Sequence, residues 1–311
     1  IVKKMVFLKK SKIKSFLIIL VLMVIISCSP NIPLFGCIEG DCVEGKGTWL
    51  EANGNKYIGT FKDGYRYGNG TLLYPDGEKW EGSWKKNKKW DGEGVLKNIW
   101  IRYKGKYKNG QWDGNGHYQL SNWPLNDKYN GSWENGKMHG KGRYIFSSGG
   151  QYEGTWINGK MHGIGKLVYS TGSTYEGAFK DGFSHGPGTY STIKGYSYKG
   201  NFEYDVIQGI GLEKQDGIYE YKGDFYNGQR QGSGEMIKAD GTIYKGTWYK
   251  GKKDGFGIEK ISDGTVYIGE WRKGHKNGRG RIKKNSKKIS YGIWIEGKLE
   301  LIATEAEVST F

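Results

Sequence analysis

Pairs of aromatic residues recur along this chain at a nearly constant interval. Each pair has the form aromatic-x-Gly-x-aromatic, as in Tyr57-x-Gly59-x-Phe61, and the next pair begins 23 residues later at Trp80. Side chains two residues apart in a strand point to the same face. The pattern predicts strands that carry two rings and a small central residue on one face. The pairs are Tyr57 and Phe61, Trp80 and Trp84, Tyr103 and Tyr107, Tyr129 and Trp133, Tyr152 and Trp156, Tyr175 and Phe179, Tyr198 and Phe202, Tyr221 and Phe225, Tyr244 and Trp248, and Tyr267 and Trp271.

Glycine-containing turns follow these strands. Dipeptides such as Asp63-Gly64 and Asn158-Gly159 tolerate the positive φ of a tight hairpin turn. A pair of glycines comes next, as at Gly68 and Gly70, and we expect the second strand to follow this pair. Pro75-Asp76-Gly77 then turns the chain into the next unit. Each repeat unit is therefore predicted to form one β-hairpin.

A single hairpin is marginal in water, so neighbouring units must stack to bury their rings. We therefore predict an all-β fold, an elongated single antiparallel sheet or solenoid of consecutive hairpins, with about 21 strands and a length on the order of 100 Å. The array spans residues 44–299, with about ten full repeats and partial units at Gly45-x-Gly47 and Tyr291-Gly292-Ile293-Trp294. Residues 300–311 form a tail or a cap for the last edge.

This pattern of Tyr-x-Gly-x-Trp/Phe followed by Gly-x-Gly resembles the MORN repeat family (membrane occupation and recognition nexus). The resemblance covers about residues 45–299 and implies lipid or protein binding rather than catalysis. Three units depart from the pattern. Repeat two has its glycine pair one position late, at Gly92 and Gly94, repeat three carries an insertion at 121–128, and repeat seven has Asp205-Val206 in place of a turn glycine. These departures are either sites of specificity or tolerated loop variation.

The N-terminal region has the features of a secretory signal. Residues 16–26 carry no charge, follow several lysines and precede Ser27-Cys28. This run is too short to span a bilayer, which needs about 20 apolar residues. Ile25-Ile26-Ser27-Cys28 resembles the lipobox of bacterial lipoproteins, which implies a signal peptide at 1–27, a lipid on Cys28 and a place in the bacterial cell envelope, on either membrane. A plain signal or an uncleaved anchor is the alternative, and residues 28–43 are expected to form a linker.

Export affects the interpretation of Cys37 and Cys42. In an oxidising compartment these two cysteines form a small disulfide loop or remain free thiols near the tether. A metal site would need about four ligands, which this segment does not supply.

The positive charge is concentrated in the last repeats. The chain carries a formal net charge of +16, and residues 244–298 contain 15 Lys and Arg against 5 Asp and Glu. Lys283, Lys284, Lys287 and Lys288 form a basic knob in the last hairpin connection. It is either a contact for anionic phospholipid or a solvated edge that discourages strand pairing. Aromatic residues near lysines also occur in single-strand binders, but export argues against nucleic acid as a partner.

No set of residues predicts catalysis or a cofactor. His139, His162 and His185 recur every 23 residues, but equivalent positions lie two strands apart, roughly 9.6 Å, whereas metal ligands lie about 2 Å from the ion. Ser191-x-x-Lys194 lacks any companion motif. We therefore expect no enzyme, no metal and no cofactor.

Three functions are compatible with these patterns. The first is a membrane-tethered lipoprotein scaffold for a protein or extracellular polymer, since long repeat surfaces suit extended partners. The second is direct phospholipid binding through the basic C-terminal repeats. The third is glycan or cell-wall binding, which requires exposed rings. The repeat aromatics are either a structural ladder or a binding face.

Overall fold

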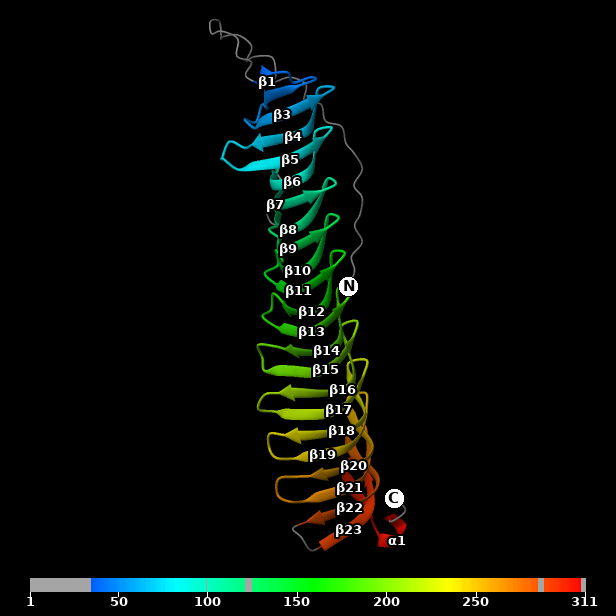
Figure 1. Cartoon of the computed structure of the whole chain (residues 1–311). Coiled ribbons are helices and arrows are strands. Elements are labelled where there is room, and N and C mark those ends of the chain that lie inside the picture. Colours follow the sequence, from blue (N-terminus) through cyan, green and yellow to red (C-terminus); the bar gives the residue numbers. More distant parts are fainter. Residues whose placement is uncertain (1–34, 99, 121–124, 285–287, 309–311) are drawn as a thin grey trace, which may run out of the picture.

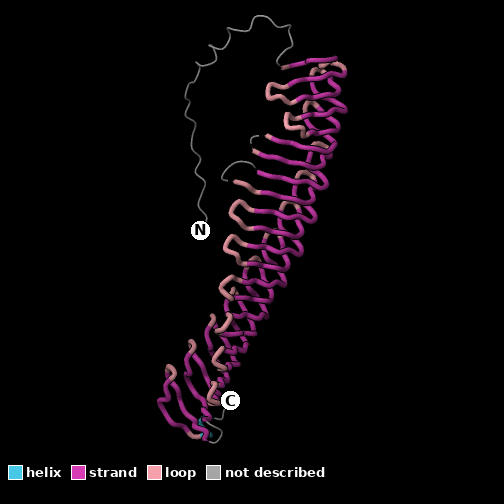
Figure 2. The backbone as a smooth tube through the Cα atoms, turned by 90° about the vertical axis from the view of Figure 1, so that its left-hand side faces the viewer, coloured by secondary structure: helices cyan, strands magenta, loops and turns pink. Residues whose placement is uncertain are grey.

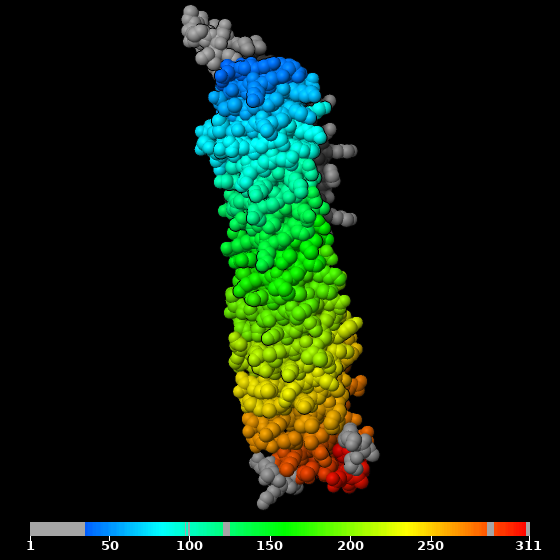
Figure 3. Space-filling model, viewed as in Figure 1, coloured from blue at the N-terminus to red at the C-terminus, as the bar shows by residue number. Residues whose placement is uncertain are grey.

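The computed structural model describes residues 35–98, 100–120, 125–284 and 288–308 (Figure 1). These residues form a long rod (Figure 3). The strands are β1 (Gly36–Gly40), β2 (Lys46–Leu50), β3 (Lys56–Lys62), β4 (Tyr65–Leu73), β5 (Lys79–Lys85), β6 (Lys88–Lys97), β7 (Ile101–Lys108), β8 (Gln111–Leu120), β9 (Lys128–Glu134), β10 (Lys137–Ile145), β11 (Gln151–Ile157), β12 (Lys160–Val168), β13 (Thr174–Lys180), β14 (Phe183–Ser191), β15 (Tyr196–Glu203), β16 (Val206–Gln215), β17 (Tyr219–Tyr226), β18 (Gln229–Lys238), β19 (Ile243–Tyr249), β20 (Lys252–Lys260), β21 (Val266–Arg272), β22 (His275–Lys284), β23 (Lys288–Ile295) and β24 (Lys298–Ala303), followed by helix α1 (Glu305–Val308).

Each strand pairs antiparallel with the next strand in the sequence, so that the whole array is one sheet. The predicted elongated sheet of consecutive hairpins is therefore confirmed. Within the described residues the sheet has 24 strands rather than about 21, because the partial units at both ends add strands. The hairpin turns lie along the two long edges, and the strand direction changes gradually along the rod, as the twist of β-sheets requires (Figure 2).

The first hairpin shows how one unit is built. Asp63 and Gly64 have φ values of 53° and 73° and form the expected turn between β3 and β4. The second strand begins earlier than predicted, directly after this turn, and therefore contains the glycine pair. Gly68, with φ 61°, lies within a β-bulge in which the register shifts between the pairs Gly59–Gly70 and Phe61–Arg66. The first glycine of the pair thus adopts the positive φ of the bulge and is not part of a loop.

In the nine units that begin with tyrosine, the second glycine of the pair makes room for the tyrosine ring. Gly59 pairs with Gly70, and Gly70 pairs with Gly82 in the next unit, so that glycines form a row across the sheet, which we call the glycine row. A Cβ atom at Gly70 would lie 2.5 Å from Cε2 of Tyr57. The tyrosine ring therefore lies flat over this row, which only glycine permits.

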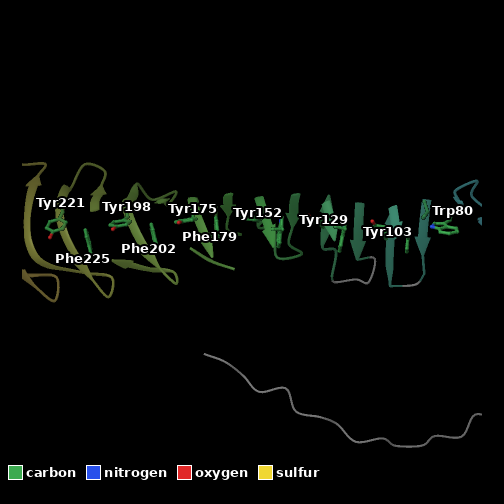
Figure 4. Packing of buried hydrophobic residues seen from close by; sticks show 14 of the residues in the cluster. Trp80, Tyr103, Tyr129, Tyr152, Tyr175, Phe179, Tyr198, Phe202, Tyr221 and Phe225 are labelled. Atoms are coloured by element: carbon green, nitrogen blue, oxygen red, sulfur yellow. The ribbon is translucent and has the colours of Figure 1, made fainter. Parts of the chain in front are cut away.

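The rings pack against one another to form a continuous core along one face, which we call the ring face (Figure 4). The Tyr57 ring makes edge-on contacts with Phe61 of its own unit at 5.2 Å and with Trp84 of the next unit at 5.1 Å. The same arrangement recurs to Tyr267 and Trp294, whose centroids are 5.1 Å apart. Each such contact contributes about 0.5–1.5 kcal/mol beyond burial, so stacked hairpins stabilise one another.

The N-terminal end differs from the expected linker. Residues 36–40 of the segment assigned to the linker form β1, which pairs with β2. Cys37 and Cys42 form a disulfide, with Cα atoms 5.9 Å apart. A Cβ at Gly47 would lie 2.7 Å from the Cys42 sulfur, which covers the glycine row where no tyrosine is present. Residues 1–34, including Cys28 and the signal segment, lie outside the described residues.

The C-terminal end also differs from the expectation. Residues 300–303 complete β24 and residues 305–308 form α1, so the predicted tail is partly a strand of the sheet. Tyr291 does not occupy the tyrosine position of a last half unit. That position holds Ser290, which pairs with Ile282, because the 24-residue interval places Tyr291 on the opposite face, beside Arg281. Among the described residues, no helix has the length and apolarity needed to cross a membrane.

Candidate interaction surface

A second layer of side chains lies on the ring face. It consists of the residues that pair with the second ring of each unit, and we call it the overlay row. Its members change from cationic to apolar and back to cationic along the rod. In order they are Arg66, Lys89, Trp112, Met138, Met161, Ser184, Ile207, Arg230, Lys253, Lys276 and Leu299.

The C-terminal cations of this row are held by rings and carboxylates. The Lys253 ammonium lies 4.4 Å from the Trp271 ring centroid and 2.6 Å from the Glu259 carboxylate. Lys276 approaches the same carboxylate at 3.2 Å. Burial alone would raise the pKa of Glu259, but hydrogen bonds and charge from the two lysines hold this pKa below its usual value. These pairs are largely buried and close the surface over the last repeats.

Two further cations repeat this arrangement. The Arg230 guanidinium lies 5.0 Å from the Tyr221 ring centroid, and its Nε donates to Glu213 at 2.7 Å. At the other end, the Arg66 guanidinium lies 4.9 Å from the Tyr57 centroid and forms an ion pair with Glu51. Charged pairs above aromatic rings therefore cover the overlay row at Arg66 and from Arg230 to Lys276.

Lys89 is the exception among these cations. Its Nζ donates to the Val95 carbonyl at 2.6 Å and to the Tyr74 hydroxyl at 3.1 Å, and no ion pair to a carboxylate is found for it in the described part of the chain. Burial is the main cause that lowers the pKa of Lys89 to about 7. Repeat two thus contains a lysine ammonium group that forms no ion pair with a carboxylate among the described residues.

The middle of the overlay row is apolar. The Trp112 ring stacks on Tyr103 at 4.4 Å with an interplanar angle of 7°, and its Nε1 donates to the Tyr107 hydroxyl at 3.0 Å. Met138 and Met161 continue the row in the next two units. A cavity of about 400 Å³ opens here on the ring face. It is lined by Ile101, Trp112, Tyr118, Trp133, Gly136, Lys137, Met138, Tyr144 and Gly159.

Residues 125–128 of the repeat-three insertion are described, and Asp127 lies beside Tyr144 of this cavity. The Asp127 carboxylate accepts a hydrogen bond from the Ser147 backbone N–H at 2.6 Å. This contact connects the insertion to the turn of the following unit. The departure from the repeat in unit three therefore lies beside the apolar part of the ring face.

The predicted site residues fall in several separate places. All twenty repeat aromatics are buried, with exposed fractions of 0–8%, so their rings form the structural ladder. Lys283 and Lys284 are exposed at the end of β22, and Lys284 pairs with Lys288. Lys287 lies outside the described residues.

The histidines do not converge on a shared site. His139, His162 and His185 occupy equivalent places in β10, β12 and β14. No group of three or more His, Cys, Asp or Glu suited to a metal ion occurs in the part of the chain that the structure describes. The absence of enzymatic activity stays a prediction.

The overlay row was missed by sequence reasoning. Its residue types vary from Arg to Met to Ser, so that no recurring letter marks the position. The signal that was available is its constant place, five residues after the second ring in every unit from Phe61 to Trp294.

Comparison with known families agrees with this geometry. The sequence profile of the MORN repeat matches eight segments that together cover more than half of the chain: residues 57–79, 103–123, 129–151, 152–174, 175–195, 221–243, 244–266 and 267–286. This chain belongs to the MORN repeat family. The unmatched units of this MORN array are repeats two and seven, which the sequence had already distinguished.

Similarities to individual proteins are weak. No curated protein sequence matches this MORN protein. Among solved structures, it is similar to the SAS-4 (dCPAP) TCP domain of Drosophila melanogaster in complex with a proline-rich motif of Ana2 (dSTIL), at 10% identity and a TM-score of 0.33, over 50% of this chain and 84% of that chain. It also matches a streptogramin B lyase at 12% identity and a TM-score of 0.12, over 85% and 84%. Such scores carry no argument about function.

Proposed function

We propose that this MORN protein is a membrane-anchored scaffold that binds a partner protein on the ring face at repeats three to five. The observation that carries the proposal is the interruption of the charged overlay row by Trp112, Met138 and Met161, beside a cavity of about 400 Å³. Flexible methionine side chains and rings with accessible surface suit the binding of apolar side chains.

Charged pairs cover other parts of the ring face, at Arg66 in repeat one and from Arg230 to Lys276 in repeats eight to ten. Lys253 and Glu259 are each about 12% exposed, so a ligand would have to displace a buried ion pair to bind there. The apolar stretch carries no such cost. A partner segment with apolar side chains therefore fits repeats three to five better than the units covered by charged pairs.

The anchor is supported by the sequence alone. The run at 16–26 and Ile25-Ile26-Ser27-Cys28 favour a lipid on Cys28 and a place in the bacterial cell envelope. We expect Cys28→Ser to move the protein from the membrane fraction to the soluble fraction. Retention of the variant in the membrane fraction would show that another segment anchors it.

Site-specific photo-crosslinking in cells tests the binding surface. A photoreactive residue at Met138 faces the cavity, whereas one at the exposed Lys141 of the same strand points to the opposite face. We expect a discrete protein adduct from position 138 only, and its loss when Met161→Glu is added. Identical adducts from both positions, or none from either, would contradict the proposal.

Contact with anionic phospholipid is a second candidate, and it is favoured by exposed lysines on one edge. Lys238, Lys260, Lys283 and Lys284 all end strands at the same long edge and are exposed. Each adds roughly 1 kcal/mol near an anionic surface. Sedimentation with anionic vesicles at low salt, lost on changing Lys283, Lys284, Lys287 and Lys288 to Ala, would support this candidate. Binding to neutral vesicles alone would exclude it.

The glycan hypothesis loses its main support. It required exposed rings, whereas the repeat aromatics are packed inside the ladder. We therefore do not assign sugar stacking to these twenty residues.

A further inference from the structure

The last strand of the array leaves an apolar edge open. In β24, Leu299, Leu301 and Ile302 are 44%, 57% and 79% exposed. The strand pairs with β23 on one side, and no described residue pairs with its other side. Unpaired backbone groups beside exposed apolar side chains favour the addition of another strand.

The ring ladder ends before β24, because the last unit has no tyrosine at the position that would continue it. Ser290 replaces the tyrosine of the last unit, and Leu299 covers Gly292 in place of a ring. The glycine row itself ends on Ile302, which pairs with Gly292 and projects from the same face. The end of the array therefore lacks the tyrosine ring that covers the glycine row in the units that begin with tyrosine.

The contacts of helix α1 leave the outer edge of β24 uncovered. It packs against β22 and β23, and Val308, with 3% exposure, is its buried residue. In Figure 1 it lies beside β23 at the end of the rod. The helix thus covers part of one face of the sheet, while Ile302 remains the most exposed large apolar side chain among the described residues.

We propose that the β24 edge binds the β24 edge of a second copy of this chain. Two copies related by a two-fold axis pair their identical edges antiparallel, which is the only strand direction used in this sheet. Pairing Leu299 with Ile302 of the partner subunit places both apolar side chains on the ring face. The same contact occurs twice because of the symmetry.

The charge distribution favours this end-to-end contact over a lateral one. Residues 244–298 carry 15 basic against 5 acidic side chains, so two C-terminal halves lying side by side repel each other. An edge of six residues buries a small area, which gives a weak and concentration-dependent dimer. Attachment to one surface would raise the effective concentration.

The test is sedimentation equilibrium with small-angle X-ray scattering on the full chain carrying Cys28→Ser, over a range from low to high micromolar concentration. We expect the mass to rise from one chain toward two while the largest dimension increases from about 110 Å to about 220 Å, as 24 strands per copy require. In the same samples, hydrogen exchange of residues 298–303 should slow as the concentration increases.

Two variants distinguish dimerisation through the β24 edge from nonspecific association of exposed apolar side chains. Leu301→Lys with Ile302→Lys replaces the two most exposed apolar side chains of the edge by ammonium groups that would lose water in the contact, and we expect this variant to remain monomeric with an unchanged circular dichroism spectrum. Ile193→Lys is the matched control, because Ile193 is 76% exposed but lies in the connection between β14 and β15. It should dimerise like the parent.

Three results would overturn the proposal. They are a parent protein that is monomeric at every concentration, a dimer that survives the double lysine change, and a doubled mass without an increase in length. Hydrogen exchange of the parent decides the question even where the double variant fails to fold, because unchanged exchange at 298–303 excludes the contact.

Discussion

At the scale of single residues, the two glycines of the Gly-x-Gly pair have different roles in the units that begin with tyrosine. Gly163 has φ 62° and serves the bulge, whereas a Cβ at Gly165 would lie 2.5 Å from Cε2 of Tyr152. The ring that needs this space is a tyrosine for a further reason. Its hydroxyl donates to the Thr155 carbonyl at 3.0 Å, and the same bond, to the residue three positions on, recurs in all nine units that begin with tyrosine.

Lys89 gives a residue-scale prediction about pH. Because its pKa falls from the usual 10.5 to about 7 on folding, the unfolded chain binds more protons between these values, and stability rises with pH over this window. Lys89→Met should remove that slope and raise the free energy of unfolding at pH 7 by on the order of 2 kcal/mol. Denaturant titrations at pH 7, 8 and 9 measure both effects below the titration of the buried tyrosines.

Lys253→Met is the matched control for this change. Its ammonium also lies in the overlay row above two rings, but it is paired with Glu259 at 2.6 Å. Removing it leaves the largely buried carboxylate with Lys276 alone, so this variant should be destabilised. Equal pH slopes in the parent and Lys89→Met would mean that Lys89 is solvated in solution.

At the scale of hairpins, the sequence predicted the turns and the ring-bearing strands well because both depend on local rules. Repeat seven shows the limit of those rules. It lacks a turn glycine, yet Tyr204 and Asp205 adopt φ values of 47° and 67°, and the Asp205 carboxylate accepts from the Ser184 N–H at 2.7 Å. A hydrogen bond from the preceding hairpin thus stabilises this turn, although the residues of the turn do not themselves favour it. Such support from a neighbour is invisible in a local pattern.

The N-terminal hairpin gives an element-scale prediction. Because the Cys42 sulfur covers Gly47 and the disulfide closes a short loop, its reduction should destabilise β1 and β2 locally by about 2 kcal/mol. Hydrogen exchange of residues 36–50 should then become faster, whereas β10 to β20 should keep their protection. Faster exchange throughout the array would show instead that the whole ladder depends on this end.

At the scale of the whole molecule, hairpins follow one another along the rod at a regular step, although two full units do not match the family profile. Repeats two and seven still form the hairpins β5–β6 and β15–β16, although in repeat two Gly82 pairs with Gly92, the first glycine of its pair, and not with the second. The sequence could therefore predict a long sheet. The two ends and the overlay row could not be predicted, since each is defined by contacts between units and not by a repeated residue type.

Deletion of one complete unit tests this translational order. Removing residues 175–197 takes out 23 residues and joins Thr174 to Tyr198, so that one tyrosine replaces another over the same glycine row. The rod should shorten by two strands, roughly 9.6 Å, and keep its thermal transition. Removing residues 129–151 shortens the rod equally but takes away Met138 and Tyr144 of the cavity. Scattering should then give equal lengths for the two deletions. Crosslinking from position 112 should persist in the first deletion, which keeps repeats three to five. It should weaken in the second, where Met161 takes the place of Met138 and Leu167 takes the place of Tyr144 beside Trp112.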